Sequence, residues 1–464
     1  MHRDHFQEEE QDHKALVTRY ERMLKEEGIV FFEKQQFTNL INYYEKQHQI
    51  DKALKVLDFA FEQHPYSATF FIQKAQILME DKREAQALEL LEEAELYDSS
   101  DTEIYLTRAE IFSSFSRFDE ALATLEKVKL RISQSDTDEL HLAYATVYED
   151  MEEYDKMFNA LEKVLAFDPE NEAALERIWL CTELAERYED SIILHNKTID
   201  NNAYNHVAWY NLGHAYFGTK AYEKAAEAYE FAFVIKENFH PAYTYCSEAW
   251  TELGNYKNAI KALQQGLEVF PQSFDLCMQL GKTYELIDSF RQAKNCFIKA
   301  ARINPSSSIA FFHLGECYSQ EERWVHALSA YESAMKNEAG NAAFTAAVAE
   351  ANYQLDNNEK ADELFKEALV LDTTNNELWV QYISFLIALD ALDQAQEAVN
   401  IAEEYCETVE IECCKIAVLY KSLLQKEALQ VLQMMVYEHD GSGKIFLQLF
   451  PDFQDEQPIL EFLR

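Results

Sequence analysis

The chain has 464 residues, 48% of them apolar, and its 41 Lys and Arg stand against 83 Asp and Glu, for a formal net charge of −42. Nucleic-acid binding depends on Lys and Arg that displace counterions from phosphates, and an anionic membrane surface attracts the same residues, so this balance argues against both partners. The excess acid either keeps the chain soluble or selects a basic protein partner.

Targeting and redox signals are few. No stretch approaches the roughly 20 apolar residues of a membrane-spanning helix, and the first ten residues contain no apolar core of a secretory signal. The eight cysteines form no Cys-x-x-Cys motif, which argues against a zinc ribbon or a redox site. We therefore expect a cytoplasmic protein with no direct membrane insertion, no metal and no cofactor.

Residues 1–33 are predicted to form an N-terminal tail and a capping helix. Between Gln11 and Gly28 the apolar residues Leu16, Tyr20 and Met23 recur at helical spacing on one face. A helix with one polar face can close the exposed end of a stacked array of repeats.

Residues 34–437 repeat one pattern with a period of 34 residues. The predicted units start at Lys34, Ala68, Thr102, Asp138, Glu172, His206, His240, Phe274, Ser308, Ala342 and Asn376, and a degenerate one starts near Glu410. A period of this length is typical of a solenoid, in which each unit buries its apolar face against its neighbours.

Two positions of the repeat have a clear physical role. The eighth holds a small residue that allows two helices to approach closely: Ala75, Ala109, Ala145, Gly213, Ser247, Gly281, Gly315 and Ala349. The twenty-fourth holds a large apolar residue in most units: Leu57, Leu91, Leu125, Leu161, Tyr229, Leu263, Phe297, Tyr331 and Phe365. These residues are predicted to form a continuous core.

The sixth unit contains the clearest copy, Trp209-x2-Leu212-Gly213-x2-Tyr216 followed by Ala225-x3-Tyr229 and Ala232. This pattern resembles the tetratricopeptide repeat. The resemblance covers more than four fifths of the chain. It implies an all-α, right-handed superhelix (an α-solenoid) of stacked helix pairs, with helical caps at both ends.

The fifth unit departs from the pattern. It has Trp179 at the small position, His195 at the large apolar position, and Ser191 and Thr198 in place of alanines. Either this is a tolerated degenerate repeat, or the packing or curvature of the solenoid changes here. A buried His195 is expected to be a hydrogen-bonded core histidine rather than a catalytic one.

Residues 438–464 are rich in Phe, Leu and Ile, which is too apolar for a free tail. They are predicted to fold back on the last repeat as a cap, with a partner-binding tail as the alternative.

The family resemblance implies that positions 2, 5, 9 and 12 of each unit face a concave groove. In units six to nine these positions give the candidate partner-binding residues Tyr210, His214, Phe217, Thr244, Glu248, Met278, Lys282, Glu285, Phe312 and Glu316. Either a partner or the facing turn of the superhelix would cover the aromatic ones. The ninth position holds Glu110, Glu248, Glu316 and Glu350, against Lys282 alone on the basic side, which favours a basic segment.

The sequence therefore predicts a non-enzymatic scaffold, adaptor or assembly factor that holds a basic and apolar segment of a protein partner in the groove. The alternative is a rigid subunit of a larger complex that contacts its partners through the convex face and the ends. No motif for a nucleophile, a phosphate-binding loop or a metal site supports catalysis.

Overall fold

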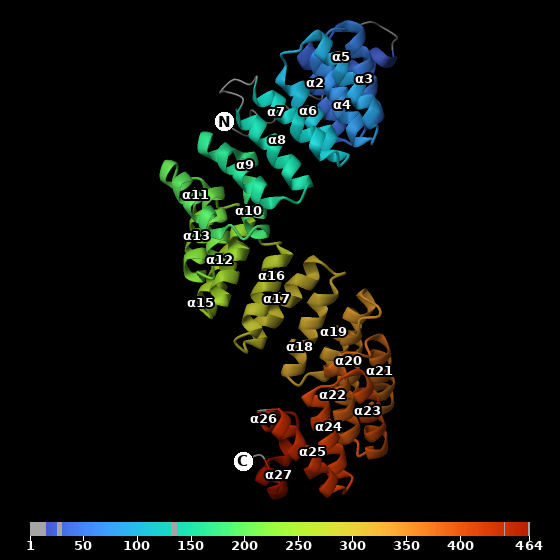
Figure 1. Cartoon of the computed structure of the whole chain (residues 1–464). Helices are drawn as coiled ribbons and strands as arrows, with labels where there is room; N and C mark the ends of the chain where they lie inside the picture. Colours follow the sequence, from blue (N-terminus) through green and yellow to red (C-terminus); the bar gives the residue numbers. More distant parts are fainter. Residues whose placement is uncertain (1–14, 26–29, 131–136, 440, 463–464) are drawn as a thin grey trace. The chain divides into compact units, whose positions relative to one another are not determined.

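The computed structural model describes residues 15–25, 30–130, 137–439 and 441–462, and all regular secondary structure in these ranges is helical (Figure 1). The chain divides into two compact units, Met1–Lys236 and Glu237–Arg464. Residues 1–14 of the predicted N-terminal tail lie outside the described ranges.

In the first unit, residues 15–25 are helical and precede six helix pairs. The helices are α2 (Lys34–Lys46), α3 (Ile50–Gln63), α4 (Ala68–Glu80), α5 (Glu84–Tyr97), α6 (Thr102–Ser114), α7 (Phe118–Lys129), α8 (Thr137–Asp150), α9 (Tyr154–Phe167), α10 (Glu172–Leu184), α11 (Tyr188–Asn201), α12 (His206–Gly218) and α13 (Tyr222–Ile235). Tyr20 is buried against Phe32, Tyr44 and Phe59, so the first helical segment covers the apolar face of the first pair.

The second unit continues with six more pairs and a C-terminal segment. Its helices are α14 (His240–Glu252), α15 (Tyr256–Val269), α16 (Phe274–Glu285), α17 (Phe290–Ile303), α18 (Ser308–Gln320), α19 (Trp324–Asn337), α20 (Ala342–Tyr353), α21 (Asn358–Leu371), α22 (Asn376–Ala388), α23 (Leu392–Tyr405), α24 (Val409–Lys421), α25 (Gln425–Glu438), α26 (Ser442–Leu449), the 3-10 helix η2 (Pro451–Asp455) and α27 (Gln457–Phe462). In the C-terminal segment Phe446, Phe453 and Ile459 are buried, and Phe453 meets the ring of Tyr420 at 5.4 Å.

The predicted all-α array of helix pairs is confirmed. The first helix of each pair begins at the residue predicted from the 34-residue period, apart from α8, which starts at Thr137 instead of Asp138, and α24, which starts at Val409. The small residues at the eighth position contact the large ones at the twenty-fourth. A Cβ atom on Gly213 would lie 2.6 Å from the ring of Tyr229, and one on Gly281 would lie 2.5 Å from the ring of Phe297.

Each turn inside a pair contains one residue with a left-handed backbone. These residues are His48, Lys82, Ser116, Glu152, Glu186, Lys220, Gly254, Asp288, Glu322, Asp356, Asp390 and Leu423. The next residue donates its N–H to a carbonyl five residues back, as Gln49 does to Tyr44 at 2.8 Å, which is the Schellman end of a helix. Glycine fits this conformation best, yet it occurs here only at Gly254, so helix pairing holds the other residues in a costly conformation.

The tenth pair offers a direct test of helix capping. The side chain of Asn341 accepts hydrogen bonds from the backbone N–H groups of Ala343 and Phe344. Asn357, at the start of the second helix of the pair, caps no backbone N–H and donates only one long hydrogen bond, of 3.4 Å, to Asn352. We expect Asn341→Ala to lower the free energy of unfolding by about 1 kcal/mol, because two helix donors lose their acceptor. Urea denaturation measures the loss, and Asn357→Ala is the matched control. An equal loss in both variants would show that the cap contributes nothing.

The fifth pair is packed differently from the others. Trp179 occupies the position where other units have a small residue, and there is no room for an indole between two closely packed helices. Accordingly α10 packs mainly against α9 and α12, and touches its own partner α11 very little. The deviation seen in the sequence is therefore a real change of packing.

His195 on α11 is fully buried, and neither ring nitrogen has a hydrogen-bond partner among the described residues. The expectation of a hydrogen-bonded core histidine is wrong. Burial excludes water from the ring, and the hydroxyl of Ser191, one helical turn earlier on α11, is also buried without a partner among the described residues. Burial lowers the pKa of His195 to about 3, so the ring is neutral at physiological pH.

Candidate protein-interaction groove

The predicted groove residues belong to both compact units. Tyr210, His214 and Phe217 lie on α12 in the first unit, and the other seven lie on α14, α16 and α18 in the second. Each set is described within its own unit.

The three residues on α12 pack against their own unit. Tyr210 is half-buried and its ring meets that of His214 at 4.6 Å, while Phe217 meets Tyr222 at 5.1 Å. His214 is buried and stacks on Trp179 at 5.9 Å. Burial lowers the pKa of His214 to about 4. Much of the aromatic surface predicted for a partner is thus covered by the first unit itself.

In the second unit the predicted apolar anchors are also covered. Met278 is buried, and the half-buried Phe312 lies 5.8 Å from Tyr331 and 5.1 Å from Phe344 between ring centres. Thr244 is half-buried.

The charged candidates of this unit fall into two groups. Glu316 accepts a hydrogen bond from the hydroxyl of Tyr331, and Glu285 lies 3.1 Å from Nδ1 of His313. Glu248 and Lys282 are exposed. Of the predicted residues, these two remain most open to solvent.

A hollow of about 250 Å³ crosses the first helices of three successive pairs in the first unit, α4, α6 and α8. It is lined by Gln76, Glu103, Leu106, Thr107, Glu110, Glu139, Leu142, Ala143 and Thr146. These are positions 2, 5, 6 and 9 of their units, which share one helix face because residues three and four apart lie above each other. We call this feature the carboxylate hollow. The positions match those that the family resemblance assigned to the groove, but the units are earlier ones.

The lining of the carboxylate hollow carries three carboxylates and no Lys, Arg or His. The pKa of Glu103 is raised mainly by partial burial and to a smaller extent by the negative charges of Asp101 and Glu139. The pKa of Glu110 is raised mainly by partial burial and to a smaller extent by the negative charges of Asp150 and Glu80. Glu103, Glu110 and Glu139 make no ion pair with any residue in the described ranges. The guanidinium of Arg177 bonds Thr146 of the lining at 3.3 Å, but it is paired with Glu149. The three glutamates therefore keep negative charge that no ion pair within the described residues neutralises, and the hollow attracts cationic groups.

The sequence contained a signal for this site. Glu110 was recognised as one of the glutamates at the ninth position, and Glu103 and Glu139 occupy the second position of consecutive units. The sequence-based prediction favoured later units because of their aromatic residues, and the partner-binding role of those units stays a prediction.

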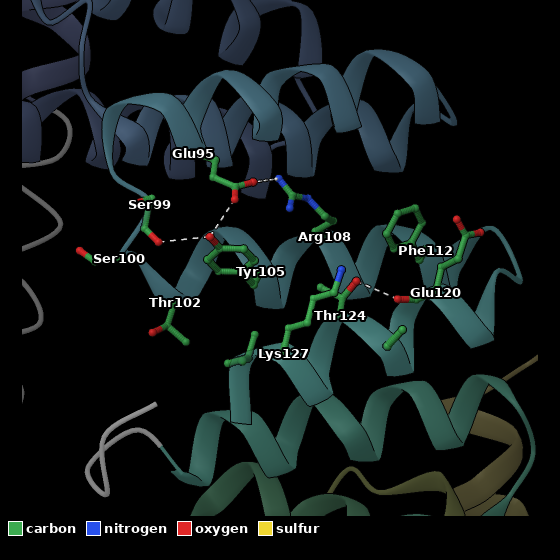
Figure 2. Close-up of a pocket in the computed structure, with 12 residues that line it drawn as sticks. Glu95, Ser99, Ser100, Thr102, Tyr105, Arg108, Phe112, Glu120, Thr124 and Lys127 are labelled. Atoms are coloured by element: carbon green, nitrogen blue, oxygen red, sulfur yellow. Dashed lines mark hydrogen bonds and ion pairs between the residues drawn. The ribbon is translucent and has the colours of Figure 1, made fainter. Parts of the chain in front are cut away.

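A larger pocket of about 690 Å³ lies between α5, α6 and α7 (Figure 2). Its polar groups are largely paired with one another. Glu95 accepts from the hydroxyl of Tyr105 at 2.9 Å and from the guanidinium of Arg108 at 2.8 Å, and Tyr105 also donates to the carbonyl of Ser99. Because the chain satisfies these groups internally, the pocket offers a ligand little beyond the ammonium of Lys127, which also lines it.

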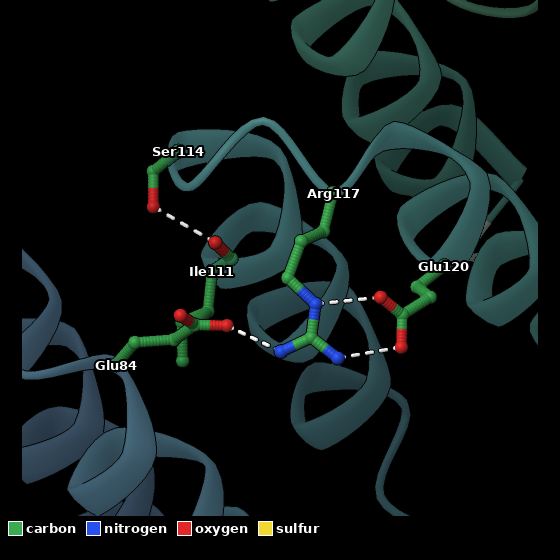
Figure 3. Close-up of polar contacts among 5 residues, drawn as sticks. All are labelled: Glu84, Ile111, Ser114, Arg117 and Glu120. Atoms are coloured by element: carbon green, nitrogen blue, oxygen red, sulfur yellow. Dashed lines mark hydrogen bonds and ion pairs between the residues drawn. The ribbon is translucent and has the colours of Figure 1, made fainter.

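Arg117 joins two successive helix pairs (Figure 3). Its guanidinium donates to both carboxylate oxygens of Glu120 at 2.5 Å and also bonds Glu84 at the start of α5. A planar guanidinium suits this forked geometry. The arrangement fixes α7 against α5, and we assign it a structural role.

The described residues contain no cluster of three or more His, Cys, Asp or Glu side chains that could hold a metal ion. No helix within them is both long and apolar enough to cross a membrane. The eight cysteines are free thiols, and burial raises the pKa of Cys181 to about 12, which suppresses its nucleophilic thiolate form.

The helix pairs repeat every 34 residues, and a small residue of one helix contacts a large residue of the other. This arrangement defines an α-solenoid. Family models for the tetratricopeptide repeat match residues 138–171, 206–238 and 274–307, and a second such model matches residues 38–101. These matches identify tetratricopeptide repeats in the chain, in agreement with the pattern of its sequence.

Among proteins of known role, the chain is similar to anaphase-promoting complex subunit 3 of Schizosaccharomyces pombe. The two are 23% identical over 143 residues, which cover 31% of this chain and 22% of that protein.

Two solved structures illustrate the structural matches. YrrB, described as a tetratricopeptide repeat protein with an unusual peptide-binding site, has 21% identity and a TM-score of 0.35, and the match covers 40% of this chain and 94% of that one. PilF of Pseudomonas aeruginosa has 15% identity and a TM-score of 0.37, with 48% and 96% covered. The tetratricopeptide repeats support a protein-interaction scaffold, and nothing in the family-model matches shows enzyme activity.

Proposed function

We propose that the chain is a non-enzymatic protein-binding scaffold that holds an extended segment of a partner protein, with basic and apolar residues, in the carboxylate hollow. The observation that carries the proposal is a hollow across three helix pairs whose lining has three carboxylates, no cation and an apolar floor.

The chemistry of the lining fits Lys and Arg side chains. Leu106, Leu142 and Ala143 offer apolar surface to their aliphatic stems, and the carboxylates accept hydrogen bonds from their charged ends. A bound cation would also lower the raised pKa values of Glu103 and Glu110. Binding near pH 5 should therefore release protons, which calorimetry in buffers of different ionisation enthalpy can detect.

In the second unit, Glu248 and Lys282 remain proposed contact positions because both are exposed. Phe312 also packs on Tyr331 and Phe344, so its replacement would report on stability as well as on binding.

The second candidate function is a rigid subunit of a larger complex that uses its outer face and ends. The similarity to a subunit of the anaphase-promoting complex favours it, as does the way Arg117 ties successive pairs together. Partners captured from native lysate distinguish the two candidates. A scaffold that binds through charge loses its partner in high salt, whereas a structural subunit retains it.

The scaffold proposal predicts a large effect of neutralising the hollow. We expect the triple variant Glu103→Gln, Glu110→Gln, Glu139→Gln to bind a fluorescein-labelled peptide of alternating Lys and Leu at least about tenfold more weakly in fluorescence anisotropy, because each close charge pair contributes on the order of 0.5–1.5 kcal/mol.

The matched control removes the same net charge from exposed positions on second helices of the same unit, Glu92→Gln, Glu162→Gln and Glu227→Gln. We expect this control to change the affinity less than about twofold, because distant charges are screened at physiological salt. Equal weakening in both triple variants would show that net charge alone attracts the peptide and would refute the hollow as the site.

A further inference from the structure

A pocket of about 240 Å³ lies between α7, α8 and α9. It is lined by Glu126, Lys129, His141, Tyr144, Tyr148, Lys156, Asn159, Ala160 and Lys163. Three lysines and a histidine thus surround one carboxylate, in a chain whose net charge is −42. We call it the lysine pocket.

The lysine pocket and the carboxylate hollow use opposite faces of α8. Glu139, Leu142 and Thr146 line the hollow, whereas Tyr144 and Tyr148 line the pocket, about half a helical turn away. One face of α8 therefore borders a negatively charged site, and its opposite face borders a positively charged one. A ligand in one site does not occupy the other.

Glu126, the only carboxylate in the lining, already has partners within the chain. Glu126 lies 3.2 Å from the ammonium of Lys129 and accepts a hydrogen bond from the hydroxyl of Tyr144 at 2.7 Å. Lys156 pairs at 3.3 Å with Glu153, which lies outside the lining. Lys163 makes no ion pair within the described part of the chain. The surplus charge of the pocket is therefore positive.

Two further groups can donate hydrogen bonds into the pocket. The side-chain oxygen of Asn159 accepts from the guanidinium of Arg187 at 3.3 Å, which leaves its amide N–H groups for a ligand. His141 is half-buried, and its pKa is lowered by burial and then by the charges of Lys163 and Lys129. The contribution of the two lysines to the lowered pKa of His141 agrees with a positive electrostatic potential in the pocket.

We propose that the lysine pocket binds the phosphoryl group of a phosphorylated side chain on a partner protein. A phosphoryl group carries a charge of about −1.5 to −2 and three acceptor oxygens, so it matches three ammonium groups and the neighbouring amide and imidazole donors. A carboxylate carries a single charge and would leave part of this set unsatisfied. This site is independent of the carboxylate hollow, and its failure would leave the proposed function untouched.

Nuclear magnetic resonance of the full chain with ¹³C-labelled histidine tests the proposal. His141→Gln assigns the resonance of His141, and three probes are titrated at constant ionic strength: inorganic phosphate, N-acetyl-phosphoserine amide and N-acetyl-aspartate amide. We expect a saturable shift with both phosphate probes, at least about tenfold weaker binding of the aspartate probe, and a rise in the pKa of His141 when a dianion is bound.

The double variant Lys129→Gln, Lys163→Gln should weaken the phosphoserine probe at least about tenfold. The matched control is Lys55→Gln, Lys197→Gln, which changes the net charge equally at exposed positions of the same unit. Absence of a saturable shift, an equal response to aspartate and phosphoserine, or an equal loss in the two double variants would each overturn the proposal. An aspartate response equal to that of phosphoserine would assign the pocket to an acidic segment instead.

Discussion

Replacing Gly281 with Ala is expected to destabilise the second unit by about 1–3 kcal/mol, whereas the same change inside an unobstructed helix stabilises it by up to about 1 kcal/mol. The added Cβ would lie 2.5 Å from the ring of Phe297, a distance that forces a shift. That ring cannot move freely, because it is fully buried and stacked on His313 at 5.0 Å. The sign of the effect, opposite to helix propensity, identifies close helix contact as its cause.

Urea denaturation of Gly281→Ala, Phe297→Leu and the double variant measures this contact. Shortening the ring removes the clash, so the double variant should lose less stability than the sum of the two single variants, with a coupling of about 0.5–3 kcal/mol. The neighbouring exposed Lys282 provides the control, and Lys282→Ala should stay within about 0.5 kcal/mol of the parent chain. A stabilised Gly281→Ala variant would contradict this account of the repeat.

The period of the sequence predicted the helix pairs because the apolar contacts that define them recur at fixed spacing. The sequence placed Gly281 at a position that allows close helix approach and Phe297 in the core, but it did not indicate that the two residues contact each other. The left-handed turn residues were not predicted. Residues as different as His48 and Leu423 adopt this conformation, so the pairing of the two helices, and not the propensity of the turn residue, determines the backbone there.

The position of the partner-binding groove stays a prediction. Helical spacing correctly indicates which face a side chain occupies, and this is why Glu110 could be identified. It does not indicate whether a neighbouring side chain covers that face. Phe312 illustrates the difficulty, because Tyr331 and Phe344 cover it from adjacent helices whose distance the sequence does not specify.

The fifth pair marks another limit of the sequence. Trp179 shows that close packing at the small position is impossible, but several rearrangements could accommodate an indole. The structure adopts the one in which α10 keeps its packing against α9 and α12, loses most of its contact with α11, and Trp179 stacks on His214. Relative energies of alternative packings decide such a choice, and no single position of the sequence encodes them.

His195 in the same pair should make the stability of the chain depend on pH. Its pKa in the folded chain is about 3, against about 6.5 for an exposed histidine, so the unfolded chain binds the proton first as the pH falls. The stability due to the neutral ring is fully present above pH 6.5 and is lost progressively as the pH falls toward 3. At pH 4.5 the loss amounts to about 3 kcal/mol, since one pKa unit corresponds to about 1.4 kcal/mol.

We therefore expect His195→Leu to be more stable than the parent chain, by about 1–2 kcal/mol at pH 7.5 and by about 4–5 kcal/mol at pH 4.5. Leucine fills this position in other units, as Leu161 and Leu263 do, and it removes two ring nitrogens that have no partner among the described residues. Urea denaturation at both pH values measures the difference between the two chains.

The difference in stability between the parent chain and His195→Leu reports on His195, because the other titratable groups are present in both chains. The lowered pKa of His214 acts in the same direction as that of His195, whereas the raised pKa values of Glu103 and Glu110 add stability as the pH falls. All three contributions cancel in the difference. The control is His48→Asn, because His48 is exposed and asparagine tolerates its left-handed backbone. Parallel pH curves for the parent chain and His195→Leu would show that the ring finds a proton acceptor when charged, and the fifth pair would then be less tightly closed than its burial implies.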